Sequence, residues 1–369
     1  MVSLCKLIGL ARCNDGAALL PDTETVFGVY LDRFGGAIMR AQVLDAAASR
    51  KEATLTATHC LPALWPDQRE ETVHRGIRDL AKIANDASGD GAIKLAISSP
   101  GPFLSLNHKD RANDYGTVHP TVGNAPLRGF NLPNVFRKAF RDVGGNPERL
   151  RIEVHTDAQA CAMGEAVSRD LGPDSTLAFI LVTEGIGLGL VRGRSPFGSA
   201  LHSEFGMMTV RWRGDDQLKP DSDQEKRRYS QSLSQLAENR ALWKRIAFSR
   251  ALDHPLGTSL LTEGDLAALD HRAYYLAQGC LACAVMIAPH KIILGTDLDY
   301  QDSISQMTIV HFRKFLAARQ IDREPVFSFP EIGDDDYISN SKVIPNTRNI
   351  PPLHVTGALG LCHAAATMA

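Results

Sequence analysis

Strand-like apolar runs alternate with helix-like segments along most of this chain, and this alternation constrains its fold more than any other feature. Two short apolar runs, residues 26–31 and 37–44, flank a glycine-containing turn near the N-terminus. A similar pair begins the second half, where residues 177–182 precede a glycine-rich turn and another apolar run. Such pairs predict β-hairpins. Because strands and helices then alternate, we expect an α/β protein with two similar halves.

The remaining elements follow from the spacing of apolar residues. Spacings of three and four predict helices, and short apolar runs predict buried strands. The predicted helices cover residues 68–88, 132–143, 157–166, 232–250, 265–289 and 355–369, and the predicted strands cover residues 94–98, 151–155 and 291–294. Residues 104–133 are rich in Asn, Asp, Gly and Pro, and a compact domain keeps so long a loop only if it is functional or disordered.

Length and composition exclude several classes of protein. The 369 residues suggest about two domains. A formal net charge of −2 offers no global field to a polyanion, which argues against a dedicated nucleic-acid binder. Seven irregularly spaced cysteines indicate reduced thiols in a cytoplasmic protein. No apolar run is long enough to span a membrane, and residues 1–22 predict an N-terminal extension rather than a signal peptide, because Arg12 interrupts a short apolar run.

A glycine-rich segment after residues 177–182 is the first candidate for chemistry. Gly185, Gly187 and Gly189 follow this apolar run directly. Glycine lets backbone N–H groups approach a phosphate with no Cβ in the way. A tight β-hairpin packed against another backbone explains the same spacing equally well. The segment is not a dinucleotide-binding fingerprint, because no amphipathic helix follows it, and it lacks the Gly-Lys-Ser/Thr ending of a Walker A loop.

Two carboxylates are further candidates. Asp157 stands where residues 151–155 pass into a helix of small residues, at the end of a strand where α/β proteins form ligand sites. An Asp in that place can accept a proton from a hydroxyl, although taken alone it is better explained as a helix cap, a role that Thr156 could also fill. Glu204 lies between apolar residues and a glycine and could accept hydrogen bonds from sugar hydroxyls. Taken alone, it is better explained as a surface residue in a turn.

Seven short segments indicate a protein family through their order along the chain. They are Ser98–Phe103, Asn113–Val118, His155–Glu165, Thr183–Gly189, Leu201–Gly206, Pro289–Gly295 and Val355–Leu359. Together, over about residues 26–365, they resemble the ROK family of sugar kinases, within the sugar kinase/actin/Hsp70 superfamily, and most closely its bacterial fructokinase branch. Each segment alone is a loose match, but seven in the right order are specific.

The resemblance implies two actin-like (ribonuclease H-like) α/β domains around a central cleft. On this basis we expect an N-terminal extension over residues 1–22 and a small domain over residues 23–166, completed by the helix at 355–369. A large domain is then expected over residues 167–354. The implied partner is a small-molecule sugar, with neither nucleic acid nor membrane. Because members of the family often dimerise, the resemblance also allows a homodimer.

The resemblance further implies a reaction, the ATP-dependent transfer of the γ-phosphoryl group to a hydroxyl of a hexose or related sugar, with Mg²⁺. Asp157 is the implied general base. The residues implied for the sugar are Glu204, Asn131, Thr156 and His202, and those implied for the nucleotide are Thr183, Gly185, Gly187, Gly189, Gly295, Gly35 and Gly36. Such a set of residues, with Mg²⁺, can suffice for catalysis, because phosphoryl transfer needs mostly positioning and charge neutralisation.

The two phosphate loops depart from the family pattern. The first loop of the family reads acidic-x-Gly-Gly-Thr. Here either Tyr30 replaces the acid and Phe34 the threonine, or Asp32 serves after a small insertion and contacts Mg²⁺. In the second loop Glu184 replaces the usual threonine. A carboxylate beside phosphates is repulsive unless a metal or Arg33 offsets its charge.

The zinc-binding segment of the family is altered as well. Met207 stands where the family has a histidine, and residues 207–240 contain no cysteine, so we expect no structural zinc. Ser232-Leu233-Ser234 replaces Cys-Leu-Glu, which changes the implied sugar pocket. These departures keep two other hypotheses open. One is a catalytically silent ROK-fold protein that binds a sugar or nucleotide and regulates a partner, and the other is a transferase with an unusual donor.

Overall fold

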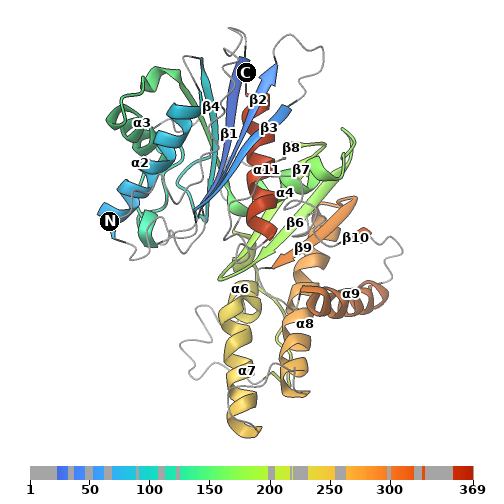
Figure 1. Ribbon diagram of the computed structural model, residues 1–369. Coiled ribbons are helices and arrows are strands. Elements are labelled where there is room, and N and C mark those ends of the chain that lie inside the picture. Colours follow the sequence, from blue (N-terminus) through green and yellow to red (C-terminus); the bar gives the residue numbers. More distant parts are fainter. Residues whose placement is uncertain are drawn as a thin grey trace. The chain divides into compact units, whose positions relative to one another are not determined.

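The chain contains two compact units, each built on one five-stranded sheet (Figure 1). The computed structural model describes residues 23–31, 37–45, 53–61, 69–88, 91–106, 113–121, 125–197, 204–216, 218, 232–253, 263–296, 301–319, 326–328 and 352–368. The described residues up to Ser168 and those from 352 onward belong to unit 1, and the others belong to unit 2. The expected extension over 1–22 lies outside the described residues.

The sheet of unit 1 has the strand order β3-β2-β1-β4-β5. Its strands are β1 (Thr23–Leu31), β2 (Ala37–Asp45), β3 (Ala53–Leu61), β4 (Ile93–Ser99) and β5 (Leu150–Thr156). β1 pairs with β2 antiparallel, which confirms the predicted hairpin, and β2 pairs with β3 in the same way. β1, β4 and β5 are parallel. The prediction omitted β3, because threonine and alanine fill most of this strand and give it a weak apolar signal.

Helices cover both faces of this sheet (Figure 1). They are α2 (Glu70–Ala87), α3 (Leu132–Asp142), α4 (Asp157–Ser168) and α11 (Pro352–Thr367). Phe27, Val29 and Leu31 of β1 share a core with α2 and α3. Because side chains alternate along a strand, Gly28 faces the opposite side, where a Cβ would lie 2.5 Å from the backbone of Ala358 in α11. The absence of a side chain at Gly28 therefore lets α11 pack directly on the sheet.

The C-terminal helix α11 is part of unit 1. It packs along α4, where a Cβ at Gly164 would overlap the carbonyl of Thr356 and a Cβ at Gly360 would overlap that of Ala160. Lys94 of β4 is 4% exposed and donates a hydrogen bond of 2.7 Å to the carbonyl of Met368, just after α11. The close helix contact and this hydrogen bond hold α11 on the sheet.

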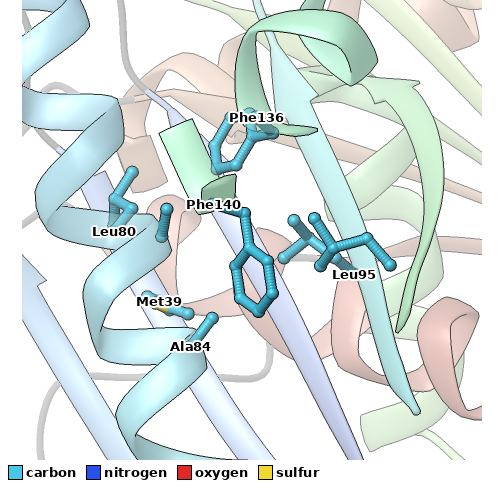
Figure 2. Close-up of a pocket in the computed structure, with 8 residues that line it drawn as sticks. Met39, Leu80, Ala84, Leu95, Phe136 and Phe140 are labelled. Atoms are coloured by element: carbon cyan, nitrogen blue, oxygen red, sulfur yellow. The ribbon is translucent and has the colours of Figure 1, made fainter. Parts of the chain in front are cut away.

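The core between the sheet and the α2/α3 layer is apolar. Figure 2 shows the ring of Phe140 between Leu80 and Ala84 of α2 and Leu95 of β4, with Phe136 one turn away on α3. The residues that line this small pocket carry no charged side chain, and Phe140 is 1% exposed. The pocket is therefore a packing feature of the core.

The sheet of unit 2 repeats the topology of unit 1. Its strand order is β10-β9-β6-β7-β8. The strands are β6 (Thr176–Val182), β7 (Ile186–Arg192), β8 (Ser195–Pro196), β9 (Lys291–Thr296) and β10 (Val326–Ser328). β6, β7 and β8 are antiparallel, whereas β6, β9 and β10 are parallel. In both sheets the first strand thus has an antiparallel hairpin on one side and two parallel strands on the other, which confirms the prediction of two similar halves.

The helices of unit 2 depart from the prediction in two places. They are α6 (Leu233–Ala237), α7 (Asn239–Asp253), α8 (Glu263–Met286) and α9 (Gln301–Ala317). The predicted helix 232–250 is two helices, because Glu238 adopts an extended backbone with ψ 167° between α6 and α7. The prediction omitted α9. The buried face of α9 includes Ile304, Thr308 and Phe312 at spacings of four. The threonine interrupts the apolar pattern along this face.

A buried ion pair anchors the segment that ends at Asp216 to the helices of unit 2. Asp216 is fully buried and accepts hydrogen bonds from Nε and Nη2 of Arg245 on α7, at 3.0 and 2.6 Å. The hydroxyl of Tyr275 on α8 donates to the same carboxylate at 2.7 Å. Burial alone would raise the pKa of Asp216, but the hydrogen bonds and charge of Arg245 outweigh it and lower the pKa below its ordinary value.

We predict that Phe140→Ala destabilises unit 1 by about 3–5 kcal/mol, because it leaves a cavity in a closely packed core. Arg141→Ala is the control, since the neighbouring side chain is exposed, and its effect should stay within about 0.5 kcal/mol. Denaturant unfolding followed by circular dichroism measures both. Equal losses for the two variants would contradict the packing shown here.

We also predict that Asp216→Asn destabilises unit 2 by about 3–5 kcal/mol near neutral pH, because it leaves the buried Arg245 without its counter-charge. Since the pKa of Asp216 is lowered by folding, the ion pair stabilises the fold above the unfolded pKa of about 3.9 and loses this effect as pH falls through the folded pKa. The difference from wild type should therefore shrink in acid.

Thermal unfolding between neutral pH and pH 3 measures this dependence. Asp215→Asn is the matched control, because this adjacent carboxylate is 62% exposed and pairs with Arg213; it should cost less than about 1 kcal/mol. A pH-independent loss for Asp216→Asn would show that the ion pair is not its cause.

Candidate functional site

The predicted glycine loop is the turn of a β-hairpin between β6 and β7. Thr183, Glu184 and Gly185 form the turn, whereas Gly187 and Gly189 lie within β7 opposite Leu181 and Phe179. The N–H of Thr183 donates to the carbonyl of Gly185 at 2.9 Å, and the N–H of Asn239 at the start of α7 donates to the carbonyl of Thr183 at 2.8 Å. The glycine spacing therefore belongs to a β-hairpin, and the nucleotide contacts of Gly187 and Gly189 stay a prediction.

The turn itself offers backbone donors to a ligand. Among the described residues, no acceptor lies within hydrogen-bond reach of the N–H groups of Glu184 and Gly185. A Cβ at Gly185 would meet no atom within 4 Å. Packing therefore does not require a glycine at this position. Two successive N–H groups without an acceptor among the described residues are donors that suit an anion such as a phosphate.

The segment that carries Glu204 lies against the same hairpin. Glu204 is exposed and precedes the short helix η3 (Phe205–Met207), where its carbonyl accepts a hydrogen bond of 2.9 Å from the N–H of Met207. Gly206 packs so closely that a Cβ there would lie 2.6 Å from the carbonyl oxygen of Ile186 and overlap Oγ of Ser234. The structure thus brings two sequence-predicted elements of unit 2 together, the glycine turn and the Glu204 segment.

Gly295 lies near the same edge of the sheet as the glycine turn. It is buried within β9, opposite Leu181 of the parallel strand β6, and Val182 stands opposite Thr296. Since the carboxyl ends of parallel strands meet at one edge of a sheet, β9 ends beside the turn that follows β6. Ligand sites of open α/β sheets form at such edges.

In unit 1, Asp157 is the first residue of α4 and follows β5 directly. The hydroxyl of Thr156 accepts a hydrogen bond of 3.1 Å from the N–H of Gln159, so Thr156 caps the helix. Oδ1 of Asp157 accepts a hydrogen bond of 2.8 Å from the N–H of Ala158. Of the two capping candidates, the structure therefore selects Thr156 and leaves the half-buried carboxylate of Asp157 at the carboxyl end of β5.

Tyr30 has a packing role in unit 1. It is 3% exposed, and its ring lies where a Cβ at Gly357 of α11 would be. Its side chain forms a hydrogen bond with Cys161 on α4, although burial and the charge of Asp157 still raise the pKa of this thiol well above its usual range. His202 lies outside the described residues. The remaining candidates in the first phosphate loop lie outside them as well, namely Asp32, Arg33, Phe34, Gly35 and Gly36.

Asn131 has a structural role that accounts for its polar atoms. Its Oδ1 accepts a hydrogen bond from the N–H of Asn134 and caps α3. Its Nδ2 donates to the carbonyl of Tyr115 at 2.9 Å and to the hydroxyl of Thr117 at 2.8 Å. The residue therefore fastens the loop around Tyr115 to α3. Its contact with a sugar stays a prediction.

Tyr115 is a residue near the site to which the sequence analysis gave no role. Its hydroxyl accepts a hydrogen bond of 2.8 Å from the N–H of Val154 on β5, three residues before Asp157. Burial raises the pKa of Tyr115 to about 12, so this hydroxyl stays protonated at neutral pH. The neighbouring Gly116 has φ +66°, and a Cβ there would lie 2.8 Å from Pro133 and from Val154. In the sequence, the pair Tyr115-Gly116 is the signal that could have identified this anchor.

Metal-ligand clusters and membrane-spanning helices are both absent from the described residues. No group of three or more His, Cys, Asp or Glu residues in these ranges is placed to hold a metal ion. No helix within them is long and apolar enough to cross a membrane.

Comparison with known proteins places the chain in a family. Residues 35–336 match the family described as the ROK family. The "Putative fructokinase" of Bacillus subtilis (strain 168) is 25% identical over 324 residues, which are 86% of this chain and 91% of that protein.

Solved structures share the fold at low sequence identity. A ROK family glucokinase from Streptomyces griseus, solved with glucose and AMPPNP, has a TM-score of 0.61 and 16% identity, and the match covers 93% of this chain and 100% of that one. The ROK hexokinase of Thermus thermophilus has a TM-score of 0.59 and 18% identity over the same shares of the two chains. A ROK family transcriptional regulator, a homologue of the E. coli MLC protein, has a TM-score of 0.57 and 12% identity over 93% of this chain and 80% of its own. The match over residues 35–336, the repeated sheet topology and these likenesses show that the chain is a member of the ROK family with the actin-like fold.

Proposed function

We propose that this protein is an ATP-dependent sugar kinase, which transfers the γ-phosphoryl group to a hydroxyl of a hexose or related sugar. The observation that carries the proposal is the turn at Glu184 and Gly185. The N–H groups of this turn lack acceptors among the described residues, and its hairpin lies against the Glu204 segment. A phosphate cradle beside a carboxylate for sugar hydroxyls is what a kinase requires of this unit. Glucose and AMPPNP bound to the Streptomyces griseus glucokinase support the same ligand classes.

In the proposed reaction, the residues of both units have defined tasks. Asp157 accepts the proton of the attacking hydroxyl, while Glu204 accepts hydrogen bonds from other hydroxyls of the sugar. The N–H groups of Glu184 and Gly185 donate to phosphate oxygens. A bond forms between the sugar oxygen and the γ-phosphorus, the bond from that phosphorus to the oxygen of the β-phosphate breaks, and ADP leaves. Asp32 is the proposed contact for Mg²⁺, which when bound would supply charge neutralisation at the phosphates.

A second candidate function is a catalytically silent ROK protein that binds a sugar or nucleotide and regulates a partner. Its support is the burial of Tyr30, which in one alignment replaces the acidic residue of the first phosphate loop. The fold is also that of a ROK family transcriptional regulator. Turnover of ATP with a sugar distinguishes the two functions.

We predict that Asp157→Asn lowers the turnover number about 10²–10⁴-fold, the range for loss of a positioned general base. The assay is ADP release from ATP and Mg²⁺ over a panel of hexoses and related sugars. Asp142→Asn is the control and should leave turnover unchanged, because Asp142 pairs with Lys138 on the surface of α3. The kinase proposal fails if the wild type shows no turnover with any sugar. It fails as well if Asp157→Asn retains full activity.

We predict that Gly185→Ala weakens binding of Mg-ATP roughly tenfold or more, because a Cβ displaces phosphate oxygens from the N–H donors and a hydrogen bond to a charged group contributes about 1.5–3 kcal/mol. Gly214→Ala is the matched control, since a Cβ at either glycine would meet no atom within 4 Å. Both variants should melt like the wild type. Calorimetric titration with Mg-AMPPNP measures affinity without turnover, and equal affinities for the two variants would remove the phosphate role of the turn.

A further inference from the structure

Ser234 occupies the point where three segments of unit 2 meet. It is the second residue of α6, and the start of this helix is fixed by contacts that do not involve it. The hydroxyl of Ser232 accepts a hydrogen bond of 3.3 Å from the N–H of Gln235, and the N–H of Leu233 donates to the carbonyl of Met208 at 2.9 Å. The position of Ser234 is therefore set by its helix, and its side chain is available for other contacts.

The hydroxyl of Ser234 contacts the exit of the glycine turn. Its Oγ accepts a hydrogen bond of 3.2 Å from the N–H of Ile186, the residue that follows Gly185 and begins β7. Together with the hydrogen bond between Thr183 and Gly185 and that from Asn239 to Thr183, this contact fixes both ends of the turn. The orientation of the Glu184 and Gly185 N–H groups therefore depends on Ser234.

The same hydroxyl also lies over the Glu204 segment. A Cβ at Gly206 would overlap Oγ of Ser234 and would lie 2.6 Å from the carbonyl oxygen of Ile186. Only a residue without a side chain lets the hydroxyl rest on this backbone. Gly206 follows Glu204 by two residues, so a shift of the Glu204 segment must displace Ser234, Ile186 or both.

We propose that Ser234 is a positioning residue that couples nucleotide binding to sugar binding. The inference rests on the proposed function, in which the turn holds the phosphates and Glu204 holds the sugar. A nucleotide that orders the turn then also orders the Glu204 segment through one hydroxyl, so the second ligand binds to a segment already in place. Linkage makes the effect reciprocal, and coupling between two sites amounts to about 5–150-fold in affinity.

The test is the affinity for glucose and for fructose, each titrated by calorimetry with and without saturating Mg-AMPPNP. In the wild type the nucleotide should tighten binding of at least one of these sugars by about fivefold or more. In Ser234→Ala this factor should fall to near one, while each ligand still binds alone. Ser195→Ala is the matched control: this exposed serine of β8 lies in the same unit, and its loss should keep the wild-type factor.

Amide hydrogen exchange gives a second readout that needs no ligand. Exchange at Ile186, whose N–H donates to Oγ of Ser234, should be faster in Ser234→Ala than in the wild type and unchanged in Ser195→Ala. An unchanged coupling factor or unchanged exchange in Ser234→Ala would overturn the inference. Wild-type protein that binds both ligands independently would overturn the coupling and leave the kinase proposal standing, whereas wild-type protein that binds neither ligand would overturn both.

Discussion

The central strand of each sheet, paired antiparallel on one side and parallel on the other, is the constraint on which this structure depends. A hairpin turn follows the carboxyl end of the central strand, and parallel neighbours end at the same edge. In unit 2 this pairing places the turn at Thr183–Gly185 beside the end of β9. In unit 1 it places the start of α4, with Asp157, at the edge where β1 and β4 also end. The candidate residues of each unit therefore gather at an edge that backbone hydrogen bonds determine.

Packing by residues without bulky side chains then fixes the elements around these edges. Gly28 and Gly164 let α11 approach the sheet and α4 at backbone distance, and Gly206 lets η3 rest on the hairpin of unit 2. A side chain at any of these positions would have to displace backbone atoms. Further along the chain after η3, the pair of Asp216 and Arg245 anchors the segment to α7. Polar contacts and close backbone packing thus share the task of holding the Glu204 segment.

Local signals predicted much of this arrangement. The hairpins at β1/β2 and β6/β7 and the helix after Asp157 follow from short-range apolar patterns. The order of seven short sequence segments predicted the family. The prediction missed β3 and α9 because threonine occupies positions where a strong apolar signal was needed. It also missed the break at Glu238, which one extended backbone conformation produces.

Contacts between distant residues were beyond the sequence analysis. The role of Tyr30 depends on Gly357, which lies at the other end of the chain. The choice between Thr156 and Asp157 as the cap required the hydrogen bond from Gln159. The role of Ser234 depends on Ile186 and Gly206, which are distant from it in the sequence.

The most direct test of the account is the response of the backbone amides of the turn to nucleotide. Amide resonances of Glu184 and Gly185 can be followed by nuclear magnetic resonance while Mg-AMPPNP is added, with Gly214 as an internal reference. The account predicts saturable shifts of the two turn amides and none at Gly214. Binding of Mg-AMPPNP that leaves both turn amides unshifted, or no binding of it at all, would contradict the claim that this turn holds the phosphates.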